Sequence, residues 1–190
     1  MGSLKFNLNR LLLTSYIMSL FSEGVILPIY AVFVQRIGGD VFDAGIALGI
    51  FLMGEGIFTA LIHNKKKRTH KQKINLMVLG WFVWFAGILF YLFISNKWTL
   101  FAAQVLLALG NALADPIYDE EFAQNTKKST EEKEWGFFEG GKSFVDGISA
   151  IAGGAIAAFF GFNILIYVMV LTATISCLII LRYVKKVRKR

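Results

Sequence analysis

The chain has 190 residues, of which 56% are hydrophobic and 15% aromatic, and its mean hydropathy is +0.58. Soluble domains are about 45–50% apolar, so this composition excludes an ordinary soluble domain and indicates a protein embedded in a lipid bilayer. The formal net charge of +7 could indicate nucleic-acid binding, but the basic residues gather in the connections between apolar runs, which argues against a nucleic-acid partner.

The apolar residues gather in six runs. Each run is long enough to cross a hydrocarbon core about 30 Å thick at about 1.5 Å per helical residue. The runs cover about residues 11–34, 44–62, 74–94, 98–122, 137–160 and 162–183. The sequence therefore predicts an all-α transmembrane protein with a single domain over residues 1–190.

The basic residues lie mainly on one side of these runs. Of the 20 lysines and arginines, Arg36 and Lys97 lie in the connections after the first and third runs, and Lys142 lies within the fifth. The other 17 precede the first run, follow the sixth, or lie after the second and fourth. By the positive-inside rule, both termini are cytoplasmic in an integral protein of the cytoplasmic (inner or plasma) membrane.

The first run carries Glu23 near its middle and Pro28 five residues later. Proline removes a backbone hydrogen bond, so it favours a kink in a membrane helix. A glutamate near the bilayer midplane is costly when charged, and such residues often mark a pathway. Two interpretations of Glu23 stay open: a proton carrier, or a protonated structural residue hydrogen-bonded to a neighbouring helix.

The second run has two glycines, Gly45 and Gly49, spaced four residues apart. Small residues at this spacing let another membrane helix approach closely. Glu55 is the only charged residue of the run and lies deep within it, so the two interpretations of Glu23 apply to it as well. We expect this helix to pack through its glycines and to present Glu55 to protein.

The third and sixth runs have no ionisable residue that could mark a pathway. The third run contains many bulky aromatic residues, including Trp81 and Trp84, and the sixth is apolar all round, with Cys177 within it. Such compositions are typical of helices that face lipid. The sequence therefore predicts that both helices lie at the periphery.

The fourth run is apolar in its first half and polar in its second, where Asn111, Asp115 and Asp119 lie. The two aspartates are four residues apart and share a helix face, where like charges repel. Their proximity requires a cation, a proton or Lys142 nearby. The alternative is that the helix emerges into water at this end.

The fifth run carries Glu139, Lys142 and Asp146, which fall within about 60° of one another on a helix. This polar stripe indicates a conduit that faces a protein interior. Alternatively, Glu139 and Lys142 pair at the membrane interface. Beside the stripe lies a row of small residues suited to close helix packing: Gly136, Gly140, Gly147, Ala150, Gly154 and Ala158.

The residues give no sign of an enzyme, a metal site or a cofactor. One cysteine, Cys177, excludes a disulfide within the chain. His63 and His70 flank a basic loop without acidic neighbours, so we expect them to be solvated rather than metal ligands. The sequence contains neither a Gly-x-Ser-x-Gly motif nor a Walker loop.

An internal repeat links the first and fourth runs. Pro28-Ile29-Tyr30 near the end of the first matches Pro116-Ile117-Tyr118 near the end of the fourth, and Pro116 is a second expected kink. Each of the two runs opens a set of three: a polar helix, a glycine-rich helix and an apolar helix. Because three is an odd number of spans, the two sets would have inverted topology.

Three stretches of the chain resemble the major facilitator superfamily, and in particular the N-terminal half of its drug-efflux members. SEGVILPIYAVFVQRIGG is similar to the first helix of that half, GNALADPIYDEEFAQ to the fourth, and GISAIAGGAIAAFFGFN to the fifth. The basic loop at 63–73 occupies the place of the family's signature loop, but Thr59, His63 and Lys66 stand where a glycine, an aspartate and a glycine are usual.

The resemblance implies a six-helix bundle that corresponds to half of a twelve-helix transporter. In that family the first and fourth helices line a central cavity, and the second and fifth flank the other half. We therefore expect a parallel homodimer in the bilayer, with Gly45, Gly49, Gly140, Gly147 and Gly154 at its interface. The alternatives are a separately encoded partner half and a chain cut from a longer gene.

The expected function is secondary active transport by alternating access, with protons and a small amphiphilic or cationic solute as the partners. The expected pathway consists of Glu23, Glu55, Asn111, Asp115, Asp119, Glu139, Lys142 and Asp146. Glu23 would carry the proton, and Lys142 would be the counter-ion of the neighbouring carboxylates. The competing hypothesis is a membrane module that transports nothing and in which the charges form closed ion pairs.

Overall fold

The computed structural model describes residues 2–64, 68–126 and 131–188, and the regular structure in these ranges is entirely helical. Its elements are α1 (Gly2–Gly24), η1 (Leu27–Ile29), α2 (Tyr30–Arg36), α3 (Val41–His63), α4 (His70–Phe90), η2 (Tyr91–Phe93), α5 (Lys97–Asn125) and α6 (Glu131–Val187). The basic residues Lys65, Lys66, Lys67, Lys127, Lys128, Lys189 and Arg190 lie outside the described ranges.

Three helices begin at reciprocal caps that fix where their apolar runs start. In each, the side chain before the helix accepts a hydrogen bond from a backbone N–H three residues on, and that residue's side chain accepts one in return. The pairs are Asp40 and Asp43 at α3, Thr69 and Gln72 at α4, and Asn96 and Thr99 at α5.

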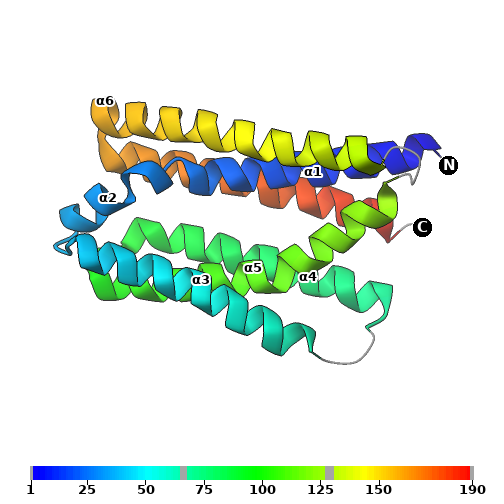
Figure 1. Cartoon of the computed structure of the whole chain (residues 1–190), viewed down its shortest axis with the longest axis horizontal. Helices are drawn as coiled ribbons and strands as arrows, with labels where there is room; N and C mark the ends of the chain where they lie inside the picture. The colour runs from blue at the N-terminus through cyan, green and yellow to red at the C-terminus, as the bar shows by residue number, and fades with distance from the viewer. Residues whose placement is uncertain (1, 65–67, 127–130, 189–190) are drawn as a thin grey trace.

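The two prolines of the repeat lie in different surroundings. Pro28 lies in the short 3-10 turn η1, where the first run breaks between α1 and α2. Pro116 lies inside α5, which remains one helix from Lys97 to Asn125 and bends in its C-terminal part (Figure 1). The break after α1 redirects the chain directly beyond Glu23.

Helix α6 contains both the fifth and the sixth run. Its 57 residues would extend about 86 Å if straight, far more than a bilayer core needs. The helix reverses at Gly161, whose φ of 83° and ψ of 170° are not helical, and its two arms run in opposite directions (Figure 1). We call residues 131–160 the first arm and residues 162–187 the second arm.

Five helical segments in the described ranges are long and apolar enough to cross a membrane by length and composition. They are Leu8–Arg36, Val41–His63, His70–Phe93, Lys97–Asn125 and Glu131–Val187. The last of them is α6, so the fifth and sixth runs share one continuous segment. The chain is thus an all-helical protein with membrane-spanning segments.

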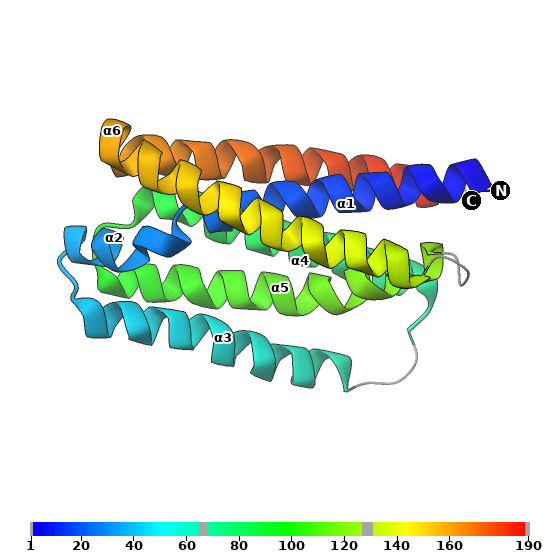
Figure 2. The same cartoon turned by 45° about the horizontal axis from the view of Figure 1, so that its top comes forward.

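The helices form two layers. One layer contains α1 and the two arms of α6, and the other contains α3, α4 and α5 (Figures 1 and 2). The start of α1, the end of α3, the start of α4, the end of α5 and both ends of α6 lie at one end of the bundle, which we call the terminal end (Figure 1).

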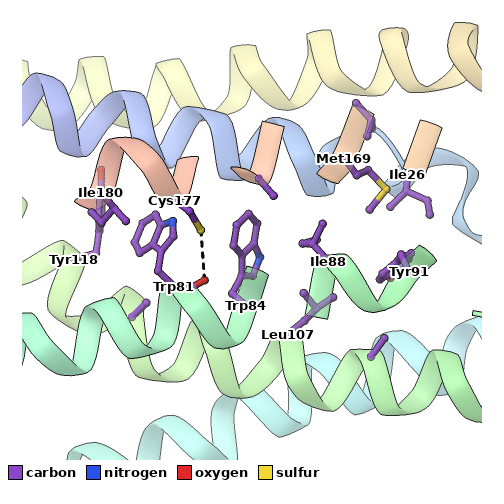
Figure 3. Close-up of a cluster of buried hydrophobic side chains, with 14 of the residues drawn as sticks. Ile26, Trp81, Trp84, Ile88, Tyr91, Leu107, Tyr118, Met169, Cys177 and Ile180 are labelled. Atoms are coloured by element: carbon purple, nitrogen blue, oxygen red, sulfur yellow. Dashed lines mark hydrogen bonds between the residues drawn. The ribbon is translucent and has the colours of Figure 1, made fainter. Parts of the chain in front are cut away.

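The core lies at the seam between the two layers. Trp81 and Trp84 of α4 are 3% and 4% exposed, and Cys177 of the second arm lies against Trp81 (Figure 3). The indole of Trp81 also donates a 2.9 Å hydrogen bond to the hydroxyl of Ser176. These contacts hold the second arm directly against α4.

The prediction that the third and sixth runs are peripheral is therefore wrong for one face of each helix, whereas the opposite faces, with Phe82 and Leu171, are exposed. In the apolar 18-residue stretch of α4, 39% of the residues are buried. In that of α3 the share is 6%, so α3 is the least covered of the five candidate segments. The second arm buries one full face, including Leu165, Ala173 and Ile180. The prediction failed because lipid tails are as apolar as a protein core, so composition does not distinguish the two.

Candidate functional site

Glu23 lies in the last turn of α1, at the seam between the layers. It is partly buried, and its carboxylate accepts a hydrogen bond from the indole N–H of Trp84. The neighbouring hydroxyl of Ser22 donates a 2.8 Å hydrogen bond to the carbonyl of Met169 on the second arm. The fold therefore holds Glu23 against protein on two sides.

Glu23 borders a small cavity that we call the acidic pocket. Its volume is about 50 Å³. Its lining residues come from α1, α4 and α5: Tyr16, Ser19, Leu20, Glu23, Trp81, Trp84, Asn111, Ala114 and Asp115. The pocket thus brings together two carboxylates and one amide that the sequence predicts to be functional, and its lining contains no basic side chain.

A second cavity, of about 70 Å³, also has Glu23 in its wall, and we call it the tyrosine pocket. The side-chain amide of Gln104 donates hydrogen bonds of 2.7 Å to the hydroxyl of Tyr30 and 2.8 Å to that of Tyr91. The rest of its lining is apolar: Ile26, Leu27, Leu48, Phe51, Ile88, Leu107 and Met169. Glu23 is the residue that the two pockets share.

The predicted ionisable residues form one electrostatic group. Asp115 is within interaction range of Glu23, Glu55, Asp119 and Lys142. In the described part of the chain, neither Asp115 nor Asp119 makes a hydrogen bond or an ion pair. The separate predictions on α1, α3, α5 and α6 therefore converge on one side of the bundle.

Two further predicted residues extend this group along the first arm of α6. Asp146 is exposed and interacts electrostatically with Glu23. Glu139 is also exposed and interacts with Asp119. Both carboxylates face away from the core, which places them on a side of the bundle that this chain does not cover.

Lys142 is the one basic residue of the group within the described helices. Its Nζ is 3.5 Å from Oε1 of Glu139, and the two side chains are 30% and 59% exposed. Nζ also lies 5.6 Å from the ring centre of Tyr16 and 5.3 Å from that of Phe138, a distance typical of cation–π contacts. An exposed ion pair contributes little stability, so the aromatic contacts are what position Lys142.

An aromatic cluster that the sequence does not predict lies beside this group. Tyr16 stacks on Tyr118 with ring centres 4.6 Å apart, and Phe122 stacks on Phe138 at 4.7 Å. The hydroxyl of Tyr118 is buried and has no hydrogen-bond partner among the described residues. These rings come from three helices far apart in sequence, so no local spacing could have revealed the cluster.

The prediction that both histidines are solvated is wrong for His63; His70 is exposed as predicted, but it does have an acidic neighbour. Nε2 of His63 lies 3.0 Å from the carbonyl oxygen of Ala112, which ties the end of α3 to α5. Nδ1 of His70 lies 3.2 Å from Oε1 of Glu121, a carboxylate that is only 3% exposed. Tyr183 donates a 2.7 Å hydrogen bond to the other oxygen of Glu121.

The glycines predicted at a dimer interface face open space. A Cβ placed on Gly45, Gly140, Gly147 or Gly154 would meet nothing within 4 Å, and on Gly49 it would meet only Met53 of the same helix, at 3.6 Å. These glycines therefore lie on faces of α3 and the first arm that the described chain leaves uncovered.

Apolar helices that are long enough to cross a bilayer, together with ionisable groups gathered within them, define a polytopic helical membrane protein. The sequence model of the Major Facilitator Superfamily matches residues 12–190. The chain belongs to this superfamily, whose members are transporters. No curated protein matches the chain.

Proposed function

We propose that this chain is one unit of a secondary active transporter that works by alternating access. In this proposal the chain crosses the membrane six times, in two inverted three-helix repeats, with both termini in the cytoplasm. It couples the movement of a small amphiphilic or cationic solute to the movement of protons. It is not an enzyme and needs no cofactor.

The observation that carries this proposal is the acidic pocket and the charges around it. Ionisable residues at membrane depth are rare, and they face protein or water where they occur. Here six carboxylates and one lysine interact across four helices, and two of the carboxylates line a cavity. An acidic lining favours protons and cations over anions, which is why we propose a cationic or amphiphilic solute.

Glu23 is the proposed proton carrier because it lines both pockets. Its carboxylate can lose the hydrogen bond from Trp84 in one state of the transport cycle and regain it in another. Lys142 is the proposed counter-ion of Asp115 and Asp119, since both carboxylates lie within its electrostatic range.

Assembly completes the pathway in this proposal. The exposed carboxylates of the first arm and the open glycines of α3 would be covered by a parallel second copy, around a central cavity. A separate partner half, or a further half of the same polypeptide, would cover the same faces in the same way.

Transport in proteoliposomes tests the role of Glu23. The protein is reconstituted, a pH gradient is imposed, and accumulation of cationic fluorescent solutes is followed for wild type and Glu23→Gln. We expect the substitution to abolish gradient-driven transport, while Glu132→Gln, a matched change at an exposed residue, retains it. Coupled transport at full rate in Glu23→Gln would overturn the assignment.

Cysteine crosslinking tests the assembly. On a Cys177→Ala background, the pair Gly45→Cys and Gly154→Cys should crosslink between chains in membranes. The pair Phe82→Cys and Leu171→Cys, on exposed faces of α4 and the second arm, should not. A strictly monomeric chain that transports nothing would favour the alternative, a six-helix scaffold whose charges form closed pairs.

A further inference from the structure

A second kind of site lies at the terminal end of the bundle, between the start of α4 and the end of α6. We call it the basic pocket. Its volume is about 570 Å³, and it is lined by His70, Lys71, Ile74, Asn75, Val187 and Arg188. It shares no residue with the acidic or the tyrosine pocket, so it is independent of the proposed transport pathway.

Two cations of this pocket have no carboxylate to neutralise them. Lys71 makes no hydrogen bond or ion pair within the described ranges. Arg188 is held across the two helices by a 2.6 Å hydrogen bond from its guanidinium to Oδ1 of Asn75. An amide oxygen orients the guanidinium but leaves its charge uncompensated.

Two carboxylates near the pocket, Glu120 and Glu121, already lie against basic side chains. Nζ of Lys73 lies 2.5 Å from Oε1 of Glu120, and His70 faces the buried carboxylate of Glu121 at 3.2 Å. The same end of the bundle therefore contains basic groups with acidic partners and, beside them, Lys71 and Arg188 without. An anion from outside the chain can therefore bind to these two without competing with a carboxylate already paired to them.

The position of the pocket indicates what kind of anion it takes. The apolar segment of α4 starts at the pocket, and Val187 is the last helical residue of α6, so the pocket lies where the spans leave the hydrocarbon. Ile74 and Val187 supply an apolar wall beside the cations. A ligand that fits both features has an anionic head and an apolar body.

We propose that the basic pocket binds the headgroup phosphate of an anionic phospholipid in the leaflet at the terminal end. Arg188 supplies the forked donor that suits a phosphate, and Lys71 supplies a second positive charge. Basic pockets between transmembrane helices are suited to such headgroups. The bound lipid would bridge α4 and the second arm of α6.

Native mass spectrometry of the whole chain tests this site. The protein in mild detergent is titrated with phosphatidylglycerol and, separately, with phosphatidylcholine. We compare wild type with K71Q/R188Q and with K185Q/K186Q, which removes the same two units of charge from exposed positions outside the pocket. Thermal unfolding of each variant checks that its fold is intact.

We expect wild type to bind phosphatidylglycerol more tightly than phosphatidylcholine. K71Q/R188Q should weaken phosphatidylglycerol binding about twenty-fivefold, from about fivefold for each cation removed, and K185Q/K186Q by less than about threefold. Asn75→Ala, which leaves the charge unchanged but frees Arg188, should give a smaller loss than K71Q/R188Q.

Three results would overturn the proposal. The first is equal binding of the two lipids by wild type. The second is an equal loss in the two double variants, which would indicate diffuse charge attraction. The third is displacement of phosphatidylglycerol by millimolar inorganic phosphate, which would show that the pocket takes a soluble anion. None of these results depends on whether the chain transports a solute.

Discussion

Glycines serve two different surfaces of this bundle. Along the contact between α4 and α5, a Cβ on Gly110 would lie 2.4 Å from the backbone nitrogen of Trp84, and one on Gly80 would lie 2.7 Å from that of Ala114. Along α3 and the first arm, a Cβ on Gly45 or Gly147 would meet nothing. The same residue type thus lets helices touch inside the chain at one surface and leaves the other surface bare.

The comparison teaches that a glycine row in a membrane helix does not identify its partner. Both surfaces have small residues at helical spacings, and both satisfy the packing preference of membrane helices. The two surfaces differ only in whether the chain itself supplies the facing helix. Substitutions that are matched across the two surfaces can therefore test the comparison directly.

The largest difference is expected between the neighbours Gly153 and Gly154. A Cβ on Gly153 would lie 1.8 Å from the carbonyl oxygen of Val25, whereas one on Gly154 would meet nothing. Gly153→Ala should destabilise the chain by about 3 kcal/mol or more, because α1 and the first arm must separate. Gly154→Ala should leave stability unchanged or raise it by up to about 1 kcal/mol.

Thermal unfolding in detergent, monitored by size-exclusion chromatography, gives the midpoint temperature of both Gly153→Ala and Gly154→Ala. Equal midpoints for the two variants would show that the first arm does not press on α1 through Gly153.

A smaller difference is expected between Gly110 and Gly45. Gly110→Ala forces α4 away from α5 at Trp84, and it should cost about 1–3 kcal/mol. Gly45→Ala meets no neighbour and should cost nothing in a monomer. The same unfolding measurement applies, and a destabilised Gly45→Ala would mean that α3 is covered in solution.

Two tryptophans extend the comparison of inner and outer surfaces to hydrogen bonding: Trp84 is buried and Trp98 is exposed. Trp84→Phe removes the donor to Glu23 and should cost about 1–2 kcal/mol. Trp98, which is 71% exposed, should tolerate the same change within about 0.5 kcal/mol. Denaturant titration monitored by circular dichroism compares them, and similar midpoints for the two variants would contradict a bond between Trp84 and Glu23 in solution.

The smallest effect on the folded chain is expected at the open glycines. Gly147→Leu should leave unfolding unchanged, because Gly147 is exposed and a Cβ there would meet no atom of the described chain within 4 Å. In the proposed homodimer it should nevertheless weaken association of two copies at least about tenfold, since small residues permit close approach between membrane helices. Energy transfer between labelled chains in liposomes measures this, with Leu178→Ala as the control on the exposed face of the second arm. Unchanged association would place the interface elsewhere.

Much of the helical architecture could be predicted from the sequence. All six apolar runs lie mainly on helical segments, and the single residue left between the last two runs, Gly161, is where α6 reverses. The prediction of helices was correct because a run of about 20 apolar residues that crosses lipid must satisfy its backbone hydrogen bonds internally, and a helix does so. The order of helices around the core could not be read in the same way.

The ionisable residues of the candidate site could be predicted from the sequence, but its neutral residues could not. Glu23 and Asp115 are conspicuous in apolar runs, and the structure brings them to one pocket. The donor Trp84 and the amide Gln104 give no such signal, because tryptophan and glutamine serve many other roles in a membrane helix. Their contacts depend on how α4 and α5 are rotated.

The sequence by itself determined that this protein lies in a membrane, which stretches form its apolar helical segments, and which of these stretches contain ionisable residues. Only the tertiary structure decided which faces are buried, that α4 and the second arm of α6 contribute to the core beside α1 and α5, and that α3 is the least covered segment. The physical reason is that lipid and protein core are equally apolar. Hydropathy therefore identifies the residues that are removed from water, but it does not identify which of them pack against another helix.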